Sequence, residues 1–300
     1  MKNYITIGGG IGGCCASVML LAKTDDVLIL EKESYLGGCS STFVKNGFKY
    51  NTGATTFAMF EPNHIVYDFF AKHKIEFKYK KLNHSHVVLH KGKKISRFLN
   101  VDDFVNEINS SYPHKKNEQF WRLVKEINNN FFAKTNYIYS CNNRLKSAIS
   151  MAPLFIEFAP YMLCSAKFFI KNFFGENISQ EYQDFIDAQI LIVAQTDSSK
   201  VNFLTAALAL GYSFYQNCYV YGGMGEIFKA FELKIKNVAT KTSVQKIKKI
   251  SNGFEVITSK DSFYTKNIVL NTPIFDSAKL FDDVNIQKYC NSFKRLDAKQ

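Results

Sequence analysis

The sequence predicts an α/β protein built on a Rossmann-like dinucleotide-binding domain, with an inserted α+β, mostly helical domain. Two observations predict the first domain. An apolar strand at residues 4–7 runs into a Gly-x-Gly-x-x-Gly turn at residues 8–13, and a second apolar strand at residues 27–30 is followed by the acid Glu31. A third predicts the insertion: apolar residues recur at helical spacing through the middle of the chain, before a strand-rich C-terminal part.

The glycines of the turn have separate physical tasks. Gly8 allows the tight turn, Gly10 lets a pyrophosphate approach the backbone, and Gly13 lets the following helix pack closely on the strand. The start of that helix offers free N–H groups and a positive dipole end to phosphates. Glu31 stands about twenty residues downstream, where an acid binds ribose hydroxyls and disfavours the 2′-phosphate of NADP. The alternative is a glycine-rich turn without a ligand.

Further elements follow in order along the chain. Residues 41–51 alternate as a strand pair around Asn46-Gly47, a strong hairpin signal. A helix begins near Pro62-Asn63, and a second strand pair, from His84 onward, turns at Lys91-Gly92. Helices are expected at residues 101–111, 116–133, 179–194 and 201–215, with Asn100 and Ser179 as N-caps. From Tyr219 the chain reads as a glycine-rich entry, a helix and several strands.

These patterns predict three segments. Residues 1–80 form the first segment of the nucleotide-binding domain, residues 81–216 an inserted substrate domain, and residues 217–300 the segment that returns to the nucleotide-binding domain.

The most apolar stretch of the middle segment is MAPLFIEFAPYMLCSAKFFIKNFFG, residues 151–175. Pro153, Glu157, Pro160 and Lys167 interrupt it, which excludes a simple membrane span. We favour a buried helix pair that lines the substrate domain. The alternative is a monotopic surface that dips into lipid, because aromatic side chains stand beside lysines.

Composition limits the classes of function. The chain has 300 residues, 46% of them hydrophobic, and no run of eighteen uncharged apolar residues, so no transmembrane helix is expected. The N-terminus leads directly into the first strand, and we expect no signal peptide. Seven cysteines without metal-type pairing predict a reducing, cytoplasmic location. The net charge is +12, but the lysines are spread along the chain and no nucleic-acid-binding module occurs, so we expect no nucleic-acid partner. A basic surface favours peripheral contact with anionic lipid at the inner face of the membrane.

Two familiar kinds of catalytic site are not expected. His84-x-His86 and His90 have no carboxylate or cysteine at ligand spacing, so we predict a solvent-facing side of a strand and no metal. No Gly-x-Ser-x-Gly elbow of a serine hydrolase occurs. No general acid or base is nominated.

Three runs carry a resemblance to a known family. They are ILEKESYLGGCSSTFVKNGFKYNTGATTF (residues 29–57), YVYGGMGEIFKAFELKIKN (219–237) and TKTSVQKIKKISNGFEVITSKDSFYTKNIVLNTP (240–273). In this order they resemble the FAD-dependent phytoene desaturases, carotenoid isomerases and retinol saturases of the flavin amine oxidase superfamily. The resemblance implies FAD as the cofactor and a large apolar isoprenoid or polyene substrate, which is desaturated or isomerised with the help of the flavin.

The resemblance also implies roles for individual residues. Glycines of the turn hold the pyrophosphate, Glu31 the adenosine ribose, and the backbone of Val244 the adenine. Residues implied to hold the cofactor are Gly8, Gly10, Gly12, Gly13, Glu31, Lys32, Gly38, Cys39, Ser40, Gly53, Ala54, Thr55 and Val244. Gly222, Gly223 and Met224 are implied to lie where the flavin and substrate cavities meet. Cys39 stands where many relatives have Arg or Ser, and we expect a small filler against the cofactor rather than a redox thiol.

The chain departs from the family pattern after Asn271-Thr272-Pro273. Relatives continue through the rest of the substrate domain and a final glycine-rich segment. We expect a truncated product, a second polypeptide that supplies the remainder, or a chain without full activity. Three alternatives stay open: a non-catalytic binding protein resembling the GDP dissociation inhibitors, a flavin amine oxidase, and a protein with NAD(P) as its only dinucleotide. The glycine pair Gly37-Gly38 argues against the last.

Overall fold

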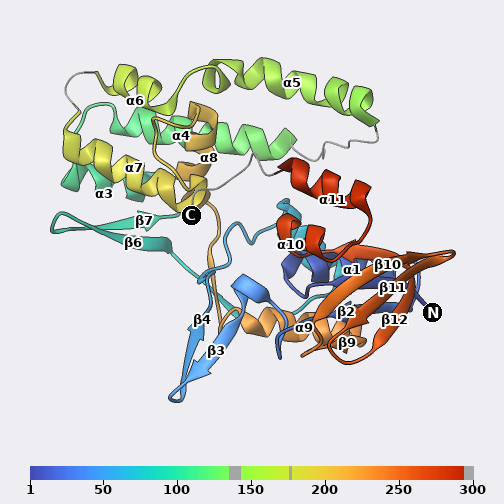
Figure 1. The fold of residues 1–300 in the computed structure, drawn as a ribbon. Helices are drawn as coiled ribbons and strands as arrows, with labels where there is room; N and C mark the ends of the chain where they lie inside the picture. The colour runs from blue at the N-terminus through green and yellow to red at the C-terminus, as the bar shows by residue number, and fades with distance from the viewer. Residues whose placement is uncertain (135–142, 176–177, 294–300) are drawn as a thin grey trace. The chain divides into compact units, whose positions relative to one another are not determined.

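The computed structural model describes residues 1–134, 143–175 and 178–293, and the chain divides into two compact units (Figure 1). Each unit is assembled from segments that are far apart in the sequence. Unit 1 comprises Met1–Thr56, Phe70–Lys80 and Tyr219–Gln300, and unit 2 comprises Phe57–Phe69 and Lys81–Cys218.

Unit 1 contains a six-stranded sheet whose central strands are parallel. Its strand order is β10 (Val244–Ile250), β11 (Gly253–Thr258), β12 (Ser262–Leu270), β1 (Lys2–Ile7), β2 (Val27–Leu30) and β9 (Val238–Ala239). β12, β1, β2 and β9 run parallel, while β10, β11 and β12 form an antiparallel meander. Ile7 is in register with both Leu30 and Leu270, so three parallel strands end at one edge of the sheet. This confirms the predicted α/β class.

The two faces of the sheet are covered differently. The helix α1 (Ile11–Leu21) packs on β1, β2 and α9 (Gly225–Ile235). On this side the Ser17 hydroxyl donates to the Thr6 hydroxyl at 2.8 Å, both groups being fully buried. The other face holds the apolar cluster Ile5, Ile7, Leu28, Leu30, Ile247, Val256 and Phe281. β2 is therefore buried on both sides, which explains its uninterrupted apolar sequence.

Shorter elements complete unit 1. The predicted hairpin is confirmed as β3 (Thr42–Lys45) and β4 (Phe48–Asn51), and Asn46 and Gly47 at its tip both have positive φ, as a two-residue hairpin turn requires. The other short elements of unit 1 are the 3-10 turn η1 (Gly38–Ser40), α10 (Ile274–Lys279) and α11 (Val284–Asn291). The residues of α2 (Ile65–His73), β5 (Tyr79–Lys81) and β8 (Cys218–Val220) are divided between the two units.

Unit 2 is mostly helical. Its elements are the hairpin β6 (His84–His90) and β7 (Lys93–Phe98), and the helices α3 (Val101–Ser111), α4 (Asn117–Lys134), α5 (Arg144–Met162), α6 (Ala166–Phe174), α7 (Gln180–Ala194) and α8 (Phe203–Gly211). Both predicted N-caps are confirmed: Asn100 accepts from the amides of Asp102 and Asp103, and Ser179 accepts from that of Tyr182. The helix expected to reach residue 215 ends at Gly211 and continues as the 3-10 turn η3 (Tyr212–Phe214).

The core of unit 2 is aromatic and encloses one arginine. Phe104, Phe120 and Trp121 are fully buried. The Arg97 guanidinium lies 3.9 Å from the Phe104 ring centroid and 4.8 Å from that of Trp121, and its Nη2 donates to the Leu210 carbonyl at 2.6 Å. Burial lowers the pKa of Arg97 to about 9, so the side chain is still a cation at neutral pH. Cation–π contacts replace the carboxylate partner that a buried charge usually has.

One expectation for residues 151–175 is wrong. A helix pair is present, as α5 and α6, but α5 is not buried: of its described residues only Ser147 and Phe158 are classed so, and Ile156 is 78% exposed. α5 packs on α8 with one narrow side. Hydrophobicity in a sequence does not say which side of a helix has a neighbour. Among the described residues, no helix combines the length and apolar character needed to cross a membrane.

The packing of unit 2 gives a stability prediction. Phe185 is fully buried and Phe168 is 62% exposed. We expect Phe185→Ala to lower the free energy of unfolding by about 3–5 kcal/mol, because it removes a buried ring and leaves a cavity. Phe168→Ala should change it by less than about 0.5 kcal/mol. Urea unfolding followed by the fluorescence of Trp121, the single tryptophan of the chain, measures both. Equal midpoints for the two variants would contradict the described core.

Candidate functional site

A cavity of about 730 Å³ opens in unit 1 at the edge where β1, β2 and β12 end. The lining comes from five stretches of chain: the glycine turn, the residues after β2, the turn η1, the start of β10 and the residues after β12. The residues are Ile7, Gly8, Gly10, Ile11, Gly12, Leu30, Glu31, Lys32, Glu33, Tyr35, Gly37, Gly38, Cys39, Ser40, Thr242, Ser243, Val244, Asn271, Thr272, Pro273, Asp276 and Leu280. In parallel α/β sheets ligands bind at this edge.

The glycine turn is held by backbone contacts. The Gly8 amide donates to the Leu30 carbonyl at 2.9 Å. Gly8 has a φ of +96°, a backbone conformation that residues with a side chain rarely adopt. At Gly13 a Cβ atom would lie 2.1 Å from the Gly8 carbonyl oxygen. The first turn of α1 therefore lies directly against the end of β1, and no larger residue fits at Gly13.

The N-terminus of α1 points its amides toward the cavity without a side-chain cap. Gly10 is the N-cap residue, the first helical bond runs from the Cys14 amide to its carbonyl, and the first turn contains no acidic residue. The first amides of a helix have no partner within the helix. An anion can accept from these amides and interact with the positive end of the helix dipole.

Glu31 is a buried carboxylate with two backbone donors. Its Oε2 accepts from the Gly9 amide at 2.7 Å, and its Oε1 accepts from the Glu33 amide at 2.9 Å. Each oxygen keeps a further lone pair for a ligand hydroxyl. Sequence reasoning predicted only a ligand-binding role for Glu31, and the structure adds that Glu31 holds the Gly9 amide of the turn.

Other predicted site residues reach the cavity through backbone bonds. The Gly37 amide donates to the Gly9 carbonyl at 2.8 Å, which brings η1 beside the glycine turn. The Thr242 amide donates to the Glu31 carbonyl at 2.8 Å and so fixes the chain that leads into Val244. Lys32, Gly38, Cys39, Ser40 and Val244 all line the cavity, as do Gly8, Gly10 and Gly12.

Some predicted residues are not on the cavity lining. Gly13 packs behind the turn, as described above. The segment Gly53, Ala54 and Thr55 lies behind Cys39: the Ala54 amide donates to the Cys39 carbonyl at 3.4 Å, and a Cβ at Gly53 would lie 2.6 Å from that oxygen. Their contact with a cofactor stays a prediction.

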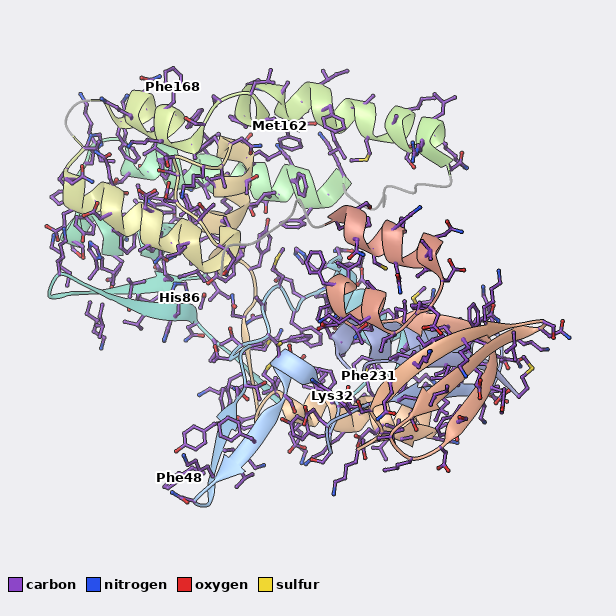
Figure 2. All side chains as sticks on the ribbon, in the orientation of Figure 1. Lys32, Phe48, His86, Met162, Phe168 and Phe231 are labelled. Carbon is purple, nitrogen blue, oxygen red and sulfur yellow. The ribbon has the colours of Figure 1, made fainter. Side chains whose placement is uncertain are left out.

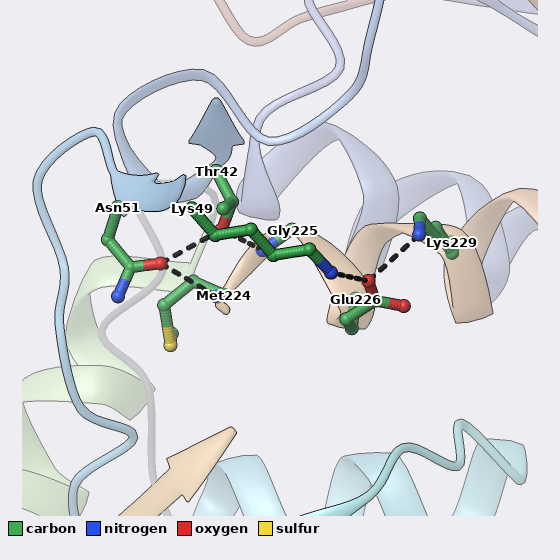
Figure 3. Close-up of polar contacts among 7 residues, drawn as sticks. All are labelled: Thr42, Lys49, Asn51, Met224, Gly225, Glu226 and Lys229. Atoms are coloured by element: carbon green, nitrogen blue, oxygen red, sulfur yellow. Dashed lines mark hydrogen bonds and ion pairs between the residues drawn. The ribbon is translucent and has the colours of Figure 1, made fainter. Parts of the chain in front are cut away.

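The predicted Gly222-Gly223-Met224 segment is held on the β3–β4 hairpin (Figure 3). Asn51 Oδ1 accepts from the Met224 amide at 3.0 Å, and Thr42 Oγ1 accepts from the Gly225 amide at 2.9 Å. These two side chains accept hydrogen bonds from backbone amides at the start of α9, which have no partner within the helix. They come from a strand pair that is about 180 residues away in the sequence. A Cβ at Gly223 would lie 2.5 Å from Thr42 Oγ1, so the contact leaves room only for glycine.

Glu226 makes one ion pair that joins the hairpin to α9 and a second one within α9. Glu226, in the first turn of α9, is paired with Lys229 at 2.8 Å and with Lys49 of the hairpin at 3.6 Å (Figure 3). The hydrogen bond from Lys229 is the main cause that lowers the pKa of Glu226 below its usual value. The negative charge of Glu226 also stabilises α9, because it lies near the positive end of the helix dipole.

The sequence reasoning missed Asn271 as a residue of the site. Its Nδ2 donates to the Gly8 carbonyl at 3.3 Å, and its Oδ1 would lie 2.6 Å from a Cβ at Gly12. Asn271 follows β12 and is 263 residues from Gly8. In the sequence, Asn271-Thr272-Pro273 indicates only the end of a strand. The pairing of β12 with β1 brings that end to the glycine turn.

The cysteines near the turn differ in character. Burial, followed by the neighbouring Cys15, raises the pKa of Cys14 to about 12, and its thiol donates to the Gly9 carbonyl at 3.4 Å. Burial also raises the pKa of Cys15 to about 11. Cys39 is exposed at the cavity.

The histidines of β6 do not all face solvent, which corrects one expectation. His84 is exposed, but His86 and His90 are half-buried. His86 Nε2 lies 3.0 Å from Gln189 Oε1, and burial is the main cause that lowers its pKa. Across residues 1–134, 143–175 and 178–293, His, Cys, Asp and Glu side chains do not gather in groups of three or more that could hold a metal ion.

Comparisons with known proteins agree with this site. A family model described as an NAD(P)-binding Rossmann-like domain matches residues 6–73. A prolycopene isomerase of Daucus carota is 25% identical over 98% of this chain and 50% of its own length. The human all-trans-retinol 13,14-reductase is 41% identical over 51 residues, which are 17% of this chain and 8% of that protein. The resemblance to carotenoid isomerases and retinol saturases is confirmed.

The fold is found in solved oxidoreductases as well. The structure of an oxidoreductase from Methanosarcina mazei superposes with a TM-score of 0.65 at 17% identity, covering 97% of this chain and 65% of that one. At this identity the likeness shows the fold alone. The chain spans about half the length of the prolycopene isomerases it matches.

The bonds of Glu31 predict a structural role that needs no ligand. In cofactor-free protein, Glu31→Ala should destabilise the turn by about 1–3 kcal/mol, because the buried Gly9 amide loses its acceptor. Hydrogen–deuterium exchange of a peptide covering residues 8–14 should become faster. The control is Glu33→Ala, whose half-exposed carboxylate lies 3.9 Å from Lys32 and should cost less than about 0.5 kcal/mol. Equal exchange in both variants would show that Glu31 does not hold the turn.

The cysteine environments predict selective alkylation. At pH 8 the pH is about four units below the pKa of Cys14, so only about one thiol in ten thousand is the reactive thiolate. We expect iodoacetamide to modify Cys39 and leave Cys14 unmodified, as measured by peptide mass spectrometry. Unfolding in guanidinium should make the two rates equal. Modification of Cys14 in the native protein as fast as that of Cys39 is the contrary result.

Proposed function

We propose that this chain binds FAD in the cavity of unit 1 and carries the cofactor-binding part of a carotenoid isomerase-like oxidoreductase. The observation that carries the proposal is the convergence of an uncapped helix N-terminus, a buried acid and the η1 loop on one cavity. The similarity to a prolycopene isomerase over 98% of the chain supports it. The chain spans about half the length of those relatives, and the oxidoreductase activity is part of this proposal.

The cavity suits a dinucleotide in several respects. The free amides at the start of α1 would hold the pyrophosphate, because no acid or side-chain cap competes for them. Glu31 would accept hydrogen bonds from the adenosine ribose, and the backbone at Val244 would meet the adenine. Lys32 and the η1 residues Gly38, Cys39 and Ser40 would continue the contact along the cofactor.

A bound flavin would supply the chemistry by accepting or donating a hydride. The residues of this chain then bind and orient. The family resemblance implies that Gly222, Gly223 and Met224 lie where the flavin and the substrate meet. The hydrogen bonds that Thr42 and Asn51 accept would keep this segment in one position. We propose a large apolar, isoprenoid or polyene substrate, from the similarity to prolycopene isomerase.

FAD binding is testable with a single glycine. Purified chain, reconstituted with FAD, should become yellow and show a flavin spectrum. Gly10→Val should weaken FAD binding at least about tenfold, or ~1.4 kcal/mol, because the side chain occupies the space that the pyrophosphate needs. The control Gly47→Asn, at the hairpin tip where nothing lies within 4 Å, should bind as the wild type does. FAD should also slow the alkylation of Cys39, a readout independent of activity.

The contrary outcomes are distinct. A colourless protein that takes up no FAD would refute the proposal, and NAD(H) binding without FAD binding would favour a plain nicotinamide domain. FAD uptake with turnover of an amine instead of a polyene would identify an amine oxidase.

A further inference from the structure

The outer side of α5 and the start of α6 form a continuous apolar surface, which we call the α5–α6 face. It consists of Leu145, Ile149, Ile156, Leu163 and Phe168, which are 76%, 65%, 78%, 87% and 62% exposed. Leu145, Ile149 and Ile156 lie on α5, and Leu163 is its C-cap residue. Spacings of four, seven and seven residues place these four in one stripe along the helix. Figure 2 shows the Phe168 side chain on α6 pointing away from the neighbouring helices.

The opposite side of the same helices anchors them to unit 2. Phe158 is 2% exposed and follows Ile149 by nine residues, which places it about 180° around the helix. On α6 the buried residues are Ala166, Ile170 and Phe174. The apolar stripe therefore faces away from the core of unit 2, and its side chains do not take part in that core.

The charge around this face is one-sided. Arg144, Lys146, Lys167 and Lys171 are exposed on α5 and α6, while the only acidic residue of these two helices is Glu157. Glu157 is already ion-paired with Lys134. A stripe of large apolar side chains bordered by cations is the pattern of a helix that lies in a lipid–water interface.

We propose that the α5–α6 face docks on an anionic lipid bilayer. The helices would lie along the surface, because none of the described helices can cross a membrane. Apolar side chains would enter the headgroup boundary, and the four cations would contact anionic headgroups. A second copy of the chain fits less well, since a symmetric contact would bring the cations of both copies together.

Vesicle flotation tests this docking. The full chain should rise with vesicles of phosphatidylcholine and phosphatidylglycerol at 3:1 and stay behind with pure phosphatidylcholine, while aggregated protein stays at the bottom of the gradient. Added salt should weaken the binding, because it screens the cations. The triple variant Ile149→Ser, Ile156→Ser, Leu163→Ser and the double variant Lys167→Glu, Lys171→Glu should each lower the partition coefficient at least tenfold.

A matched control uses exposed aliphatic residues on other elements. Ile65, Leu89 and Leu233 are 73%, 79% and 80% exposed, which is close to the three residues changed in the test variant. Their triple replacement by serine should leave vesicle binding unchanged. If this control loses binding as much as the test variant does, general hydrophobicity explains the binding and the proposal fails.

A local reporter gives a second measurement that needs no loss of function. Leu163→Trp should shift its emission to shorter wavelength when anionic vesicles are added, against a constant background from Trp121, which is fully buried. Absence of both flotation and shift would overturn the proposal. So would light scattering that finds a dimer for the wild type and a monomer for the triple variant, because the face would then be an interface between copies.

Discussion

The main-chain contact between the end of β1 and the start of α1 is the constraint on which unit 1 depends. Gly13 packs on the Gly8 carbonyl so closely that a single Cβ would lie 2.1 Å from it. This contact directs the free amides of α1 toward the edge of the sheet, where β2 and β12 also end.

Side chains from distant parts of the sequence make that arrangement rigid. Glu31 fixes the Gly9 amide, and Asn271 reaches the Gly8 carbonyl from the end of β12. Thr42 and Asn51 accept hydrogen bonds from the backbone amides at the start of α9. These backbone groups thus have defined side-chain partners, and a nucleotide would meet a preorganised surface with a low entropic cost of binding.

Unit 2 combines a buried charge in its core with an exposed apolar helix. Its core is aromatic, and it places Arg97 among rings where cation–π contacts compensate part of the cost of burying a charge. One of its long helices, α5, gives little surface to that core and exposes its large aliphatic side chains. Such an exposed apolar stripe beside cations indicates an interaction surface rather than a defect of packing.

The sequence by itself determined the α/β class, the glycine turn, the β3–β4 hairpin and the caps at Asn100 and Ser179, because each depends on neighbours within a few residues. It predicted a helix pair at residues 151–175 and favoured a buried pair over a surface one, whereas the tertiary structure leaves the stripe of α5 exposed. Asn271 beside Gly8, and the hold of the hairpin on α9, were decided only by tertiary structure. Local preferences are written in short stretches of sequence, whereas contacts across hundreds of residues depend on which strands pair.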